Sequence, residues 1–145
     1  MYESLKLDQQ LCFEVYKASS NFTKMYSRVL SPFNLTFSQY LVLVVLWEED
    51  HLVMKDIGDR LGLGIGTLHP IINRMIANGR LTKEQSTKDK RASVISLTES
   101  AKTDHGLIEQ AIVEKLTNCN FMDVSPVTLM KNLKSLNSFF RAMDL

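Results

Sequence analysis

Apolar residues in the first third of the chain recur every three or four positions, as on one face of a helix. Between residues 8 and 30 this period predicts an amphipathic helix, which Pro32 would close. Thr36 and Gln39 have the spacing of a capping box, so a second helix is expected to begin there. Residues 40–47 of that helix are apolar nearly all round, which predicts a buried core helix.

Two shorter helical patterns follow a strand-like pair at residues 52–53. They cover residues 55–61 and 67–78, and the glycine-rich segment between them predicts a tight inter-helix turn. The glycines of this predicted turn are Gly62, Gly64 and Gly66. Because proline is best tolerated in the first turn of a helix, Pro70 predicts that the second helix begins later than Ile65. Gly79 is a natural C-cap for that helix.

A β-hairpin and two further helices complete the pattern. Strands are expected at residues 81–85 and 93–97, joined by a polar tip with basic side chains. Thr98 is placed to cap a long helix that reaches Cys119, and Ser125 before Pro126 has the form of a helix start. The last helix carries an apolar seam, which would pack either inside the chain or against a second helix. Its positions are Leu129, Leu133, Leu136, Phe140 and Met143.

A short helix, a glycine turn, a second helix and a basic hairpin are the parts of a winged helix-turn-helix, here residues 54–96. Residues 74–91 hold six basic and two acidic side chains, although the 145-residue chain has a net charge of only +1. Such a cluster suits DNA phosphates, although similar clusters also occur on solvated faces. The sequence therefore predicts a mainly α protein with a small β-hairpin wing that binds double-stranded DNA.

The second helix of this module is expected to enter the major groove, and the hairpin tip to reach the neighbouring minor groove. Polar side chains on that helix are candidates for groove contacts, each with a solvated helix face as the alternative. They are Thr67, His69, Asn73 and Arg74. At the hairpin tip, Lys88 and Lys90 are the candidates for phosphate contacts.

Composition excludes several other classes of protein. No apolar run approaches the roughly 18 residues of a membrane span, and the N-terminus does not resemble a secretory signal, so we expect a cytoplasmic protein. The two cysteines are far apart and have no metal-ligand spacing, and neither do His51, His69 and His105. We therefore expect no metal, no cofactor and no structural disulfide framework.

Four segments of the chain match a known pattern: QLCFEVYKASSNFTKMY, LTFSQYLVLVVLWEED, GTLHPIINRM and DKRASVISLT. They resemble the MarR transcription regulators, specifically the branch that senses organic hydroperoxides (OhrR-like). The resemblance extends from about Leu7 to Thr98. The D-x-R wing followed by L-T is typical of the wider family, and the QLCF segment is typical of the thiol-sensing branch.

This resemblance implies a homodimer that reads a palindromic operator. It implies a single domain of residues 1–145, with a helical dimerisation region at 7–30 and 99–145 and a DNA-binding lobe at 36–97. Arg91, oriented by Asp89, would then be the residue that enters the minor groove.

Cys12, Tyr16 and Tyr26 share one face of the first predicted helix. Along that helix Cys12 and Tyr26 are about 21 Å apart, so the two sites can meet only across an antiparallel dimer. In the branch that the chain resembles, the cysteine matching Cys12 is the peroxide-reactive thiolate, and the two tyrosines line its site. The resemblance implies that Cys12 forms a sulfenic acid and then a disulfide, with Cys119 of the partner subunit or a low-molecular-weight thiol.

The chain departs from this branch at two places. Phe37 stands where the branch has a tyrosine that hydrogen-bonds the thiolate, which predicts slower oxidation. Gly64 and Ile65 replace an Asp-Ser pair, and His69 replaces a threonine, which predicts a different operator preference. Ile65 could meet a thymine methyl group.

Three functions are compatible with the sequence. The favoured one is a repressor that leaves its operator when peroxide oxidises Cys12, and that is not an enzyme. The second is a MarR-type regulator that responds to a small phenolic ligand, with Cys12 inert as a small buried hydrophobe. The third is a thiol peroxidase, which is disfavoured because no base or arginine can be placed near Cys12 and the basic module would have no purpose.

Overall fold

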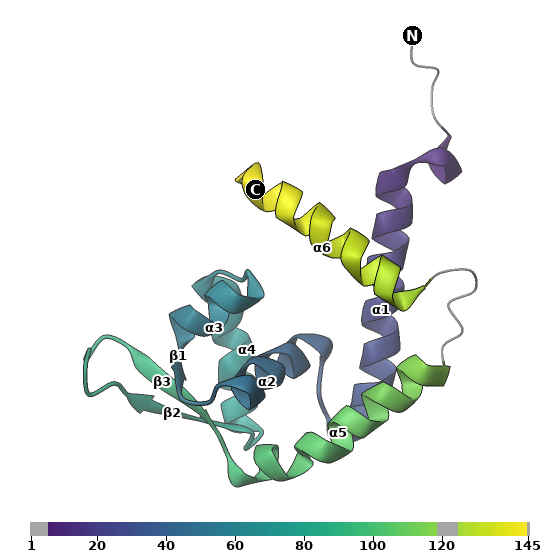
Figure 1. The fold of residues 1–145 in the computed structure, drawn as a ribbon. Helices are drawn as coiled ribbons and strands as arrows, with labels where there is room; N and C mark the ends of the chain where they lie inside the picture. Colours follow the sequence, from purple (N-terminus) through teal and green to yellow (C-terminus); the bar gives the residue numbers. More distant parts are fainter. Residues whose placement is uncertain (1–5, 119–124, 145) are drawn as a thin grey trace. The chain divides into compact units, whose positions relative to one another are not determined.

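The computed structural model describes residues 6–118 and 125–144. It is mainly helical, with one small antiparallel sheet (Figure 1). It divides into two compact units at the boundary between Ile112 and Val113. The elements of the first unit are α1 (Leu11–Leu30), α2 (Phe37–Glu48), β1 (Leu52–Val53), α3 (Met54–Leu61), α4 (Ile65–Ala77), β2 (Leu81–Gln85), β3 (Ser93–Leu97) and most of α5 (Glu99–Asn118). The second unit holds the end of α5 and α6 (Pro126–Ala142).

The first helix begins later than the sequence predicts. Leu7–Gln9 form a separate 3-10 turn, and Gln10 is extended, with φ −94° and ψ 124°, so α1 starts at Leu11. The second helix begins as predicted. Thr36 Oγ1 accepts the N–H of Gln39 at 3.2 Å, while Gln39 Oε1 accepts the N–H of Thr36 at 3.1 Å, which closes the capping box.

The predicted core helix is confirmed, because α2 supplies the centre of the first unit. Val42, Leu43 and Leu46 are at most 1% exposed. Helices α3 and α4 and strand β3 pack on α2, and each contributes fully buried side chains. These partners are Ile57, Leu68, Ile72, Met75 and Ile95.

The turn between α3 and α4 depends on a close approach of backbone to backbone. Gly62 has a left-handed φ of +69°, and the N–H of Leu63 donates to the Gly58 carbonyl at 2.9 Å. A Cβ on Gly58 would lie 2.7 Å from the Leu63 carbonyl oxygen, so this position requires glycine. The turn is shorter than predicted, because Gly66 lies inside α4.

The prediction that α4 begins after Ile65 was wrong. The helix starts at Ile65, and Pro70 lies in its second turn, where both Pro70 and Gly66 are exposed. Proline removes the helical partner of the Gly66 carbonyl, and water can satisfy this carbonyl on the exposed face. The end of the helix is as predicted: the N–H of Gly79 donates to Ile76 at 3.0 Å, and that of Arg80 to Met75 at 2.9 Å, which is a Schellman motif.

The predicted hairpin is confirmed as β2 and β3. Their antiparallel register runs from Leu81 opposite Leu97 to Gln85 opposite Ser93. The strand-like pair at 52–53 joins the same sheet beside β3, which gives the order β1-β3-β2. The sheet therefore ties the start of α3 to the hairpin and fixes the hairpin as a wing beside the helix-turn-helix.

Helix α6 begins as predicted, with Pro126 in its first turn and Ser125 Oγ accepting the N–H of Thr128 at 3.4 Å. None of its described residues is buried. Two residues of the apolar seam, Leu133 and Phe140, are 44% and 40% exposed. The predicted seam is thus an exposed apolar face on the single chain.

Among the described residues, no single helix is both long enough and apolar enough to cross a membrane. The bent pair Leu11–Phe33 and Phe37–Glu48 meets the requirement together, by length and composition alone.

Candidate DNA-binding surface and sensor helix

A groove of about 470 Å³ lies between the start of α4 and the wing. It brings together Ile65 and His69 of α4 with Asp89 and Arg91 of the hairpin tip, as the sequence interpretation requires. Three of its lining side chains are cationic and one is acidic, which favours a negatively charged partner. The lining residues are Val53, Met54, Lys55, Ile65, His69, Lys83, Asp89, Arg91, Ala92 and Ser93.

The four polar candidates on α4 are all exposed, but they divide between two flanks of the helix. His69 and Asn73 follow Ile65 at intervals of four residues, on the side of the wing groove. Thr67 and Arg74 lie on the opposite flank. Arg74 lines a second groove, of about 300 Å³, with residues from the end of α1 and the start of α2. The groove next to the wing therefore holds only part of the predicted contact set.

The hairpin tip is held by hydrogen bonds that leave its basic side chains exposed. Asp89 Oδ1 accepts the backbone N–H of Arg91 at 3.0 Å, so Asp89 orients Arg91 through the main chain. Ser86 Oγ accepts the N–H of Lys88 at 3.2 Å, and Gln85 Nε2 donates to the Lys90 carbonyl at 2.7 Å. The tip thus presents Lys88, Lys90 and Arg91 on one ordered turn.

Two basic residues have roles that the sequence interpretation did not assign. Arg80, which was counted in the basic cluster, is only 12% exposed in its side chain, and its Nη1 lies 3.2 Å from Asp104 Oδ2. Its Nη2 donates to the Phe33 carbonyl, so Arg80 joins β2 to α5 and to the turn after α1. Lys55 lines the wing groove instead. Only the folding of the wing against α3 places Lys55 beside Lys83, so no local pattern identifies it.

The sensor candidates separate into an exposed part and a half-buried part. Cys12 is exposed in the first turn of α1, and its thiol donates to Gln10 Oε1 at 3.5 Å. Tyr16 is 70% exposed. Tyr26 is half-buried, with its ring centroid 5.1 Å from that of Phe37. One chain thus brings Tyr26 to Phe37 but not to Cys12, whose side chain is exposed in the single chain. Cys119 lies outside the described residues.

An aromatic cluster extends from Tyr26 across α2 to α5, and the sequence interpretation treated two of its members, Tyr40 and Trp47, only as core. Tyr40 lies 5.9 Å from Tyr26 and 6.3 Å from Trp47 between ring centroids, and Trp47 stacks on His105 at 4.1 Å. Burial raises the pKa of the Tyr26 phenol. Burial, followed by the charges of Tyr26 and Glu109, raises the pKa of Tyr40. The cluster is therefore a partly desolvated link between α1, α2 and α5.

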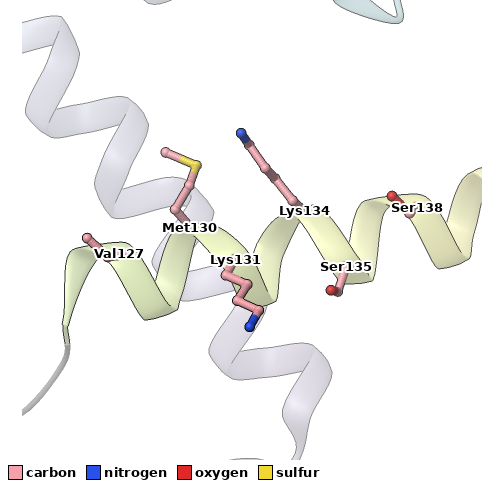
Figure 2. Close-up of a pocket in the computed structure, with 6 residues that line it drawn as sticks. All are labelled: Val127, Met130, Lys131, Lys134, Ser135 and Ser138. Atoms are coloured by element: carbon pink, nitrogen blue, oxygen red, sulfur yellow. The ribbon is translucent and has the colours of Figure 1, made fainter.

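In the part of the chain that the structure describes, no group of three or more His, Cys, Asp or Glu residues could hold a metal ion. A hollow of about 540 Å³ on α6 is also a poor ligand site, because one helix supplies its whole lining. Figure 2 shows Met130 and Lys134 rising on one side of this helix and Lys131 pointing to the other. The hollow is an open helix surface.

Comparison with known proteins gives one consistent result. The family model described as transcriptional regulator SarA/Rot matches residues 24–108, which is more than half of the chain. The chain is 40% identical over 113 residues to the organic hydroperoxide resistance transcriptional regulator of Bacillus subtilis (strain 168), covering 78% of this chain and 74% of that protein.

Two solved structures of AbfR, a Staphylococcus epidermidis protein, are also similar. Reduced AbfR bound to DNA matches with a TM-score of 0.85 and 29% identity, over 96% of this chain and 95% of that one. Disulfide-formed AbfR matches with a TM-score of 0.69 and 31% identity, over 92% of each chain. Together with the helix-turn-helix and wing described above, these matches show that the chain belongs to the MarR/SarA family of winged-helix transcriptional regulators, which includes the organic hydroperoxide resistance regulator.

Proposed function

We propose that this regulator is a homodimeric repressor that binds a palindromic operator and leaves it when a peroxide oxidises Cys12. The observation that carries the redox part is the exposed thiol of Cys12 at the start of α1, a helix that also exposes apolar side chains. A thiol in this position is open to a peroxide and lies next to a surface that a second chain would cover. The DNA-binding part is supported by the cationic groove between α4 and the wing.

On DNA, α4 lies in the major groove and the hairpin tip follows the backbone into the minor groove. The protein groove between α4 and the wing is lined by three cationic side chains, which neutralise DNA phosphates. They are Lys55, Lys83 and Arg91. Reduced AbfR, whose fold is similar, was solved bound to DNA.

Two chains form the functional unit through their helical faces. Leu11 and Val15 on α1 are 79% and 48% exposed, and α6 adds the exposed seam of Leu133 and Phe140. Burial of these side chains against a second copy contributes the hydrophobic stabilisation that the single chain lacks. The dimer then presents two α4 helices to the two halves of a palindrome.

Oxidation begins with attack of the Cys12 thiolate on the hydroxyl oxygen of an organic hydroperoxide. The S–O bond forms as the O–O bond breaks, the alkoxide leaves and takes a proton, and Cys12 becomes a sulfenic acid. A second thiol then attacks the sulfur, the S–S bond forms and water leaves. The second thiol belongs to Cys119 of the partner subunit or to a low-molecular-weight thiol. AbfR, the relative with a disulfide-formed structure, supports this chemistry.

Fluorescence anisotropy with DNA from upstream of the protein's own gene tests the proposal. Cumene hydroperoxide with a small thiol should weaken DNA binding by the wild type at least tenfold, and dithiothreitol should restore it. Cys12→Ser should bind the DNA as tightly as the reduced wild type does, and the peroxide should not change its binding. Equal release of both proteins would contradict the role of Cys12. Release of both by salicylate, with no response to peroxide, would favour the ligand-responsive alternative.

A further inference from the structure

His69 and Asn73 lie one turn apart on the exposed face of α4, and their side chains contact each other. Asn73 Nδ2 is 3.0 Å from His69 Nδ1. An amide nitrogen can only donate, so His69 Nδ1 accepts this hydrogen bond, and the neutral ring carries its proton on Nε2. The pair therefore presents an N–H donor on the ring nitrogen that lies farther from the backbone.

The helix surface at Gly66, on the same exposed face, carries no side chain. Gly66 lies between His69 and Pro70 around the helix, and a Cβ at Gly66 would meet no atom within 4 Å. Among the described residues, no atom thus lies within contact distance of a Cβ at Gly66, and the backbone of α4 can approach the floor of a DNA groove closely at this position. Ile65, one turn before His69, lines the same wing groove with Arg91.

We propose that His69 reads a guanine in the major groove by donating from Nε2 to N7, and that Asn73 is the positioning residue that fixes the tautomer. This inference rests on the proposed DNA-binding function. A single donor favours guanine because its N7 and O6 are adjacent acceptors. In adenine the N7 lies beside an amino donor, and cytosine presents only a donor in this groove.

In this proposal, sequence preference and overall affinity for DNA depend on different residues. Arg91 and Lys83 can neutralise phosphates at any sequence, whereas the imidazole N–H discriminates between base pairs. Loss of His69 or Asn73 should therefore change which DNA is bound more than how strongly random DNA is bound.

Selection from a DNA library randomised in one half-site tests the assignment. Wild type and the control Lys102→Ala, on α5 away from the groove, should select the same motif with one guanine. His69→Ala and Asn73→Ala should each lose the preference at that guanine by about tenfold and bind scrambled DNA as before. Asn73→Gln, which keeps an amide donor, should retain the preference.

Replacing the selected guanine by 7-deazaguanine, which lacks the N7 acceptor, then tests the atom. The replacement should weaken wild-type binding about tenfold and leave His69→Ala unchanged. The inference is overturned if both proteins respond equally, if Asn73→Ala keeps the full preference, or if the base pair that depends on His69 is A·T. If reduced wild type binds no DNA of the library, the proposed function fails, and this inference fails with it.

Discussion

The α4–wing region and the α1–α6 faces differ in how much of their structure one chain provides. The first rests on fully buried side chains, and ordered turns hold its hairpin tip. The second exposes apolar residues along α1, and α6 has no buried residue among those described. The α4–wing region thus folds within a single chain, whereas α1 and α6 leave apolar side chains exposed, which the proposed dimer would cover. Oxidation of Cys12 is then expected to change the distance between the two α4–wing regions of the proposed dimer, each of which stays folded.

The largest effect should follow from disrupting the exposed apolar seam of α6. Leu133→Asp combined with Phe140→Asp places two charges in the exposed seam of α6 and should leave a monomer. Affinity for a palindromic operator should fall about a hundredfold or more, because the second half-site no longer benefits from linkage to the first. Light scattering and anisotropy measure both effects.

Lys131→Asp is the matched control for that variant, because Lys131 is exposed on α6 outside the seam. It should remain dimeric. Circular dichroism should show the helical content of the double variant preserved. A double variant that stays dimeric at micromolar concentration would contradict the assignment of the α6 face.

The next largest effect should come from a mostly buried residue of the α4–wing region. Arg80→Ala removes the ion pair with Asp104 and the hydrogen bond to the Phe33 carbonyl, and the half-buried carboxylate loses its partner. We expect a loss of about 2–3 kcal/mol in the free energy of unfolding. Below the melting temperature, DNA affinity should keep its salt dependence. A weaker salt dependence in this variant would mean that Arg80 does contact phosphate.

Arg91→Ala should behave in the opposite way. We expect a loss of about 1–3 kcal/mol in DNA affinity and a shallower salt dependence, with an unchanged free energy of unfolding. The basis is its exposed position on the ordered hairpin tip. Lys102→Ala on α5 is the control and should change neither quantity. Unaltered operator binding by Arg91→Ala would show that the Arg91 side chain does not contact DNA.

The smallest effect concerns the aromatic cluster that links α1, α2 and α5. Burial raises the pKa of Tyr26 and Tyr40, so the unfolded chain loses these phenolic protons before the folded one does. Their contribution to stability is fully present below the ordinary phenol value of about 10 and decreases as the pH rises above it. Ultraviolet absorbance should show late-ionising tyrosines, and Tyr26→Phe and Tyr40→Phe should each remove one. If neither substitution changes the titration curve at pH values above about 10, the burial of these rings is contradicted.

The sequence predicts the parts of the fold that local interactions determine. The capping box of Thr36 and Gln39, the C-cap at Gly79 and both strands of the hairpin join residues close in sequence, and the structure confirms them. The start of α4 was mispredicted because the rule for Pro70 considers only the lost N–H. On an exposed helix face, water can compensate for that loss.

Contacts between distant segments account for what the sequence did not predict in the site. Arg80 has the composition of a phosphate ligand, and only Asp104, 24 residues later, makes it structural. Lys55 enters the groove because the wing folds back against α3, and Tyr40 joins Tyr26 through the packing of α1 on α2. The separation of Cys12 from Tyr26 follows from helix geometry and was predicted.

One titration shows directly whether the redox state of Cys12 controls DNA binding. Reduced protein on operator DNA receives increasing cumene hydroperoxide in the presence of a small thiol. Intact mass spectrometry gives the fraction of chains with a disulfide at Cys12, and anisotropy gives the fraction bound to DNA in the same samples. We expect the bound fraction to fall as the disulfide fraction rises, and dithiothreitol to reverse both. Protein that stays bound with Cys12 fully in a disulfide, or that leaves DNA while Cys12 is still a thiol, would contradict this control by Cys12.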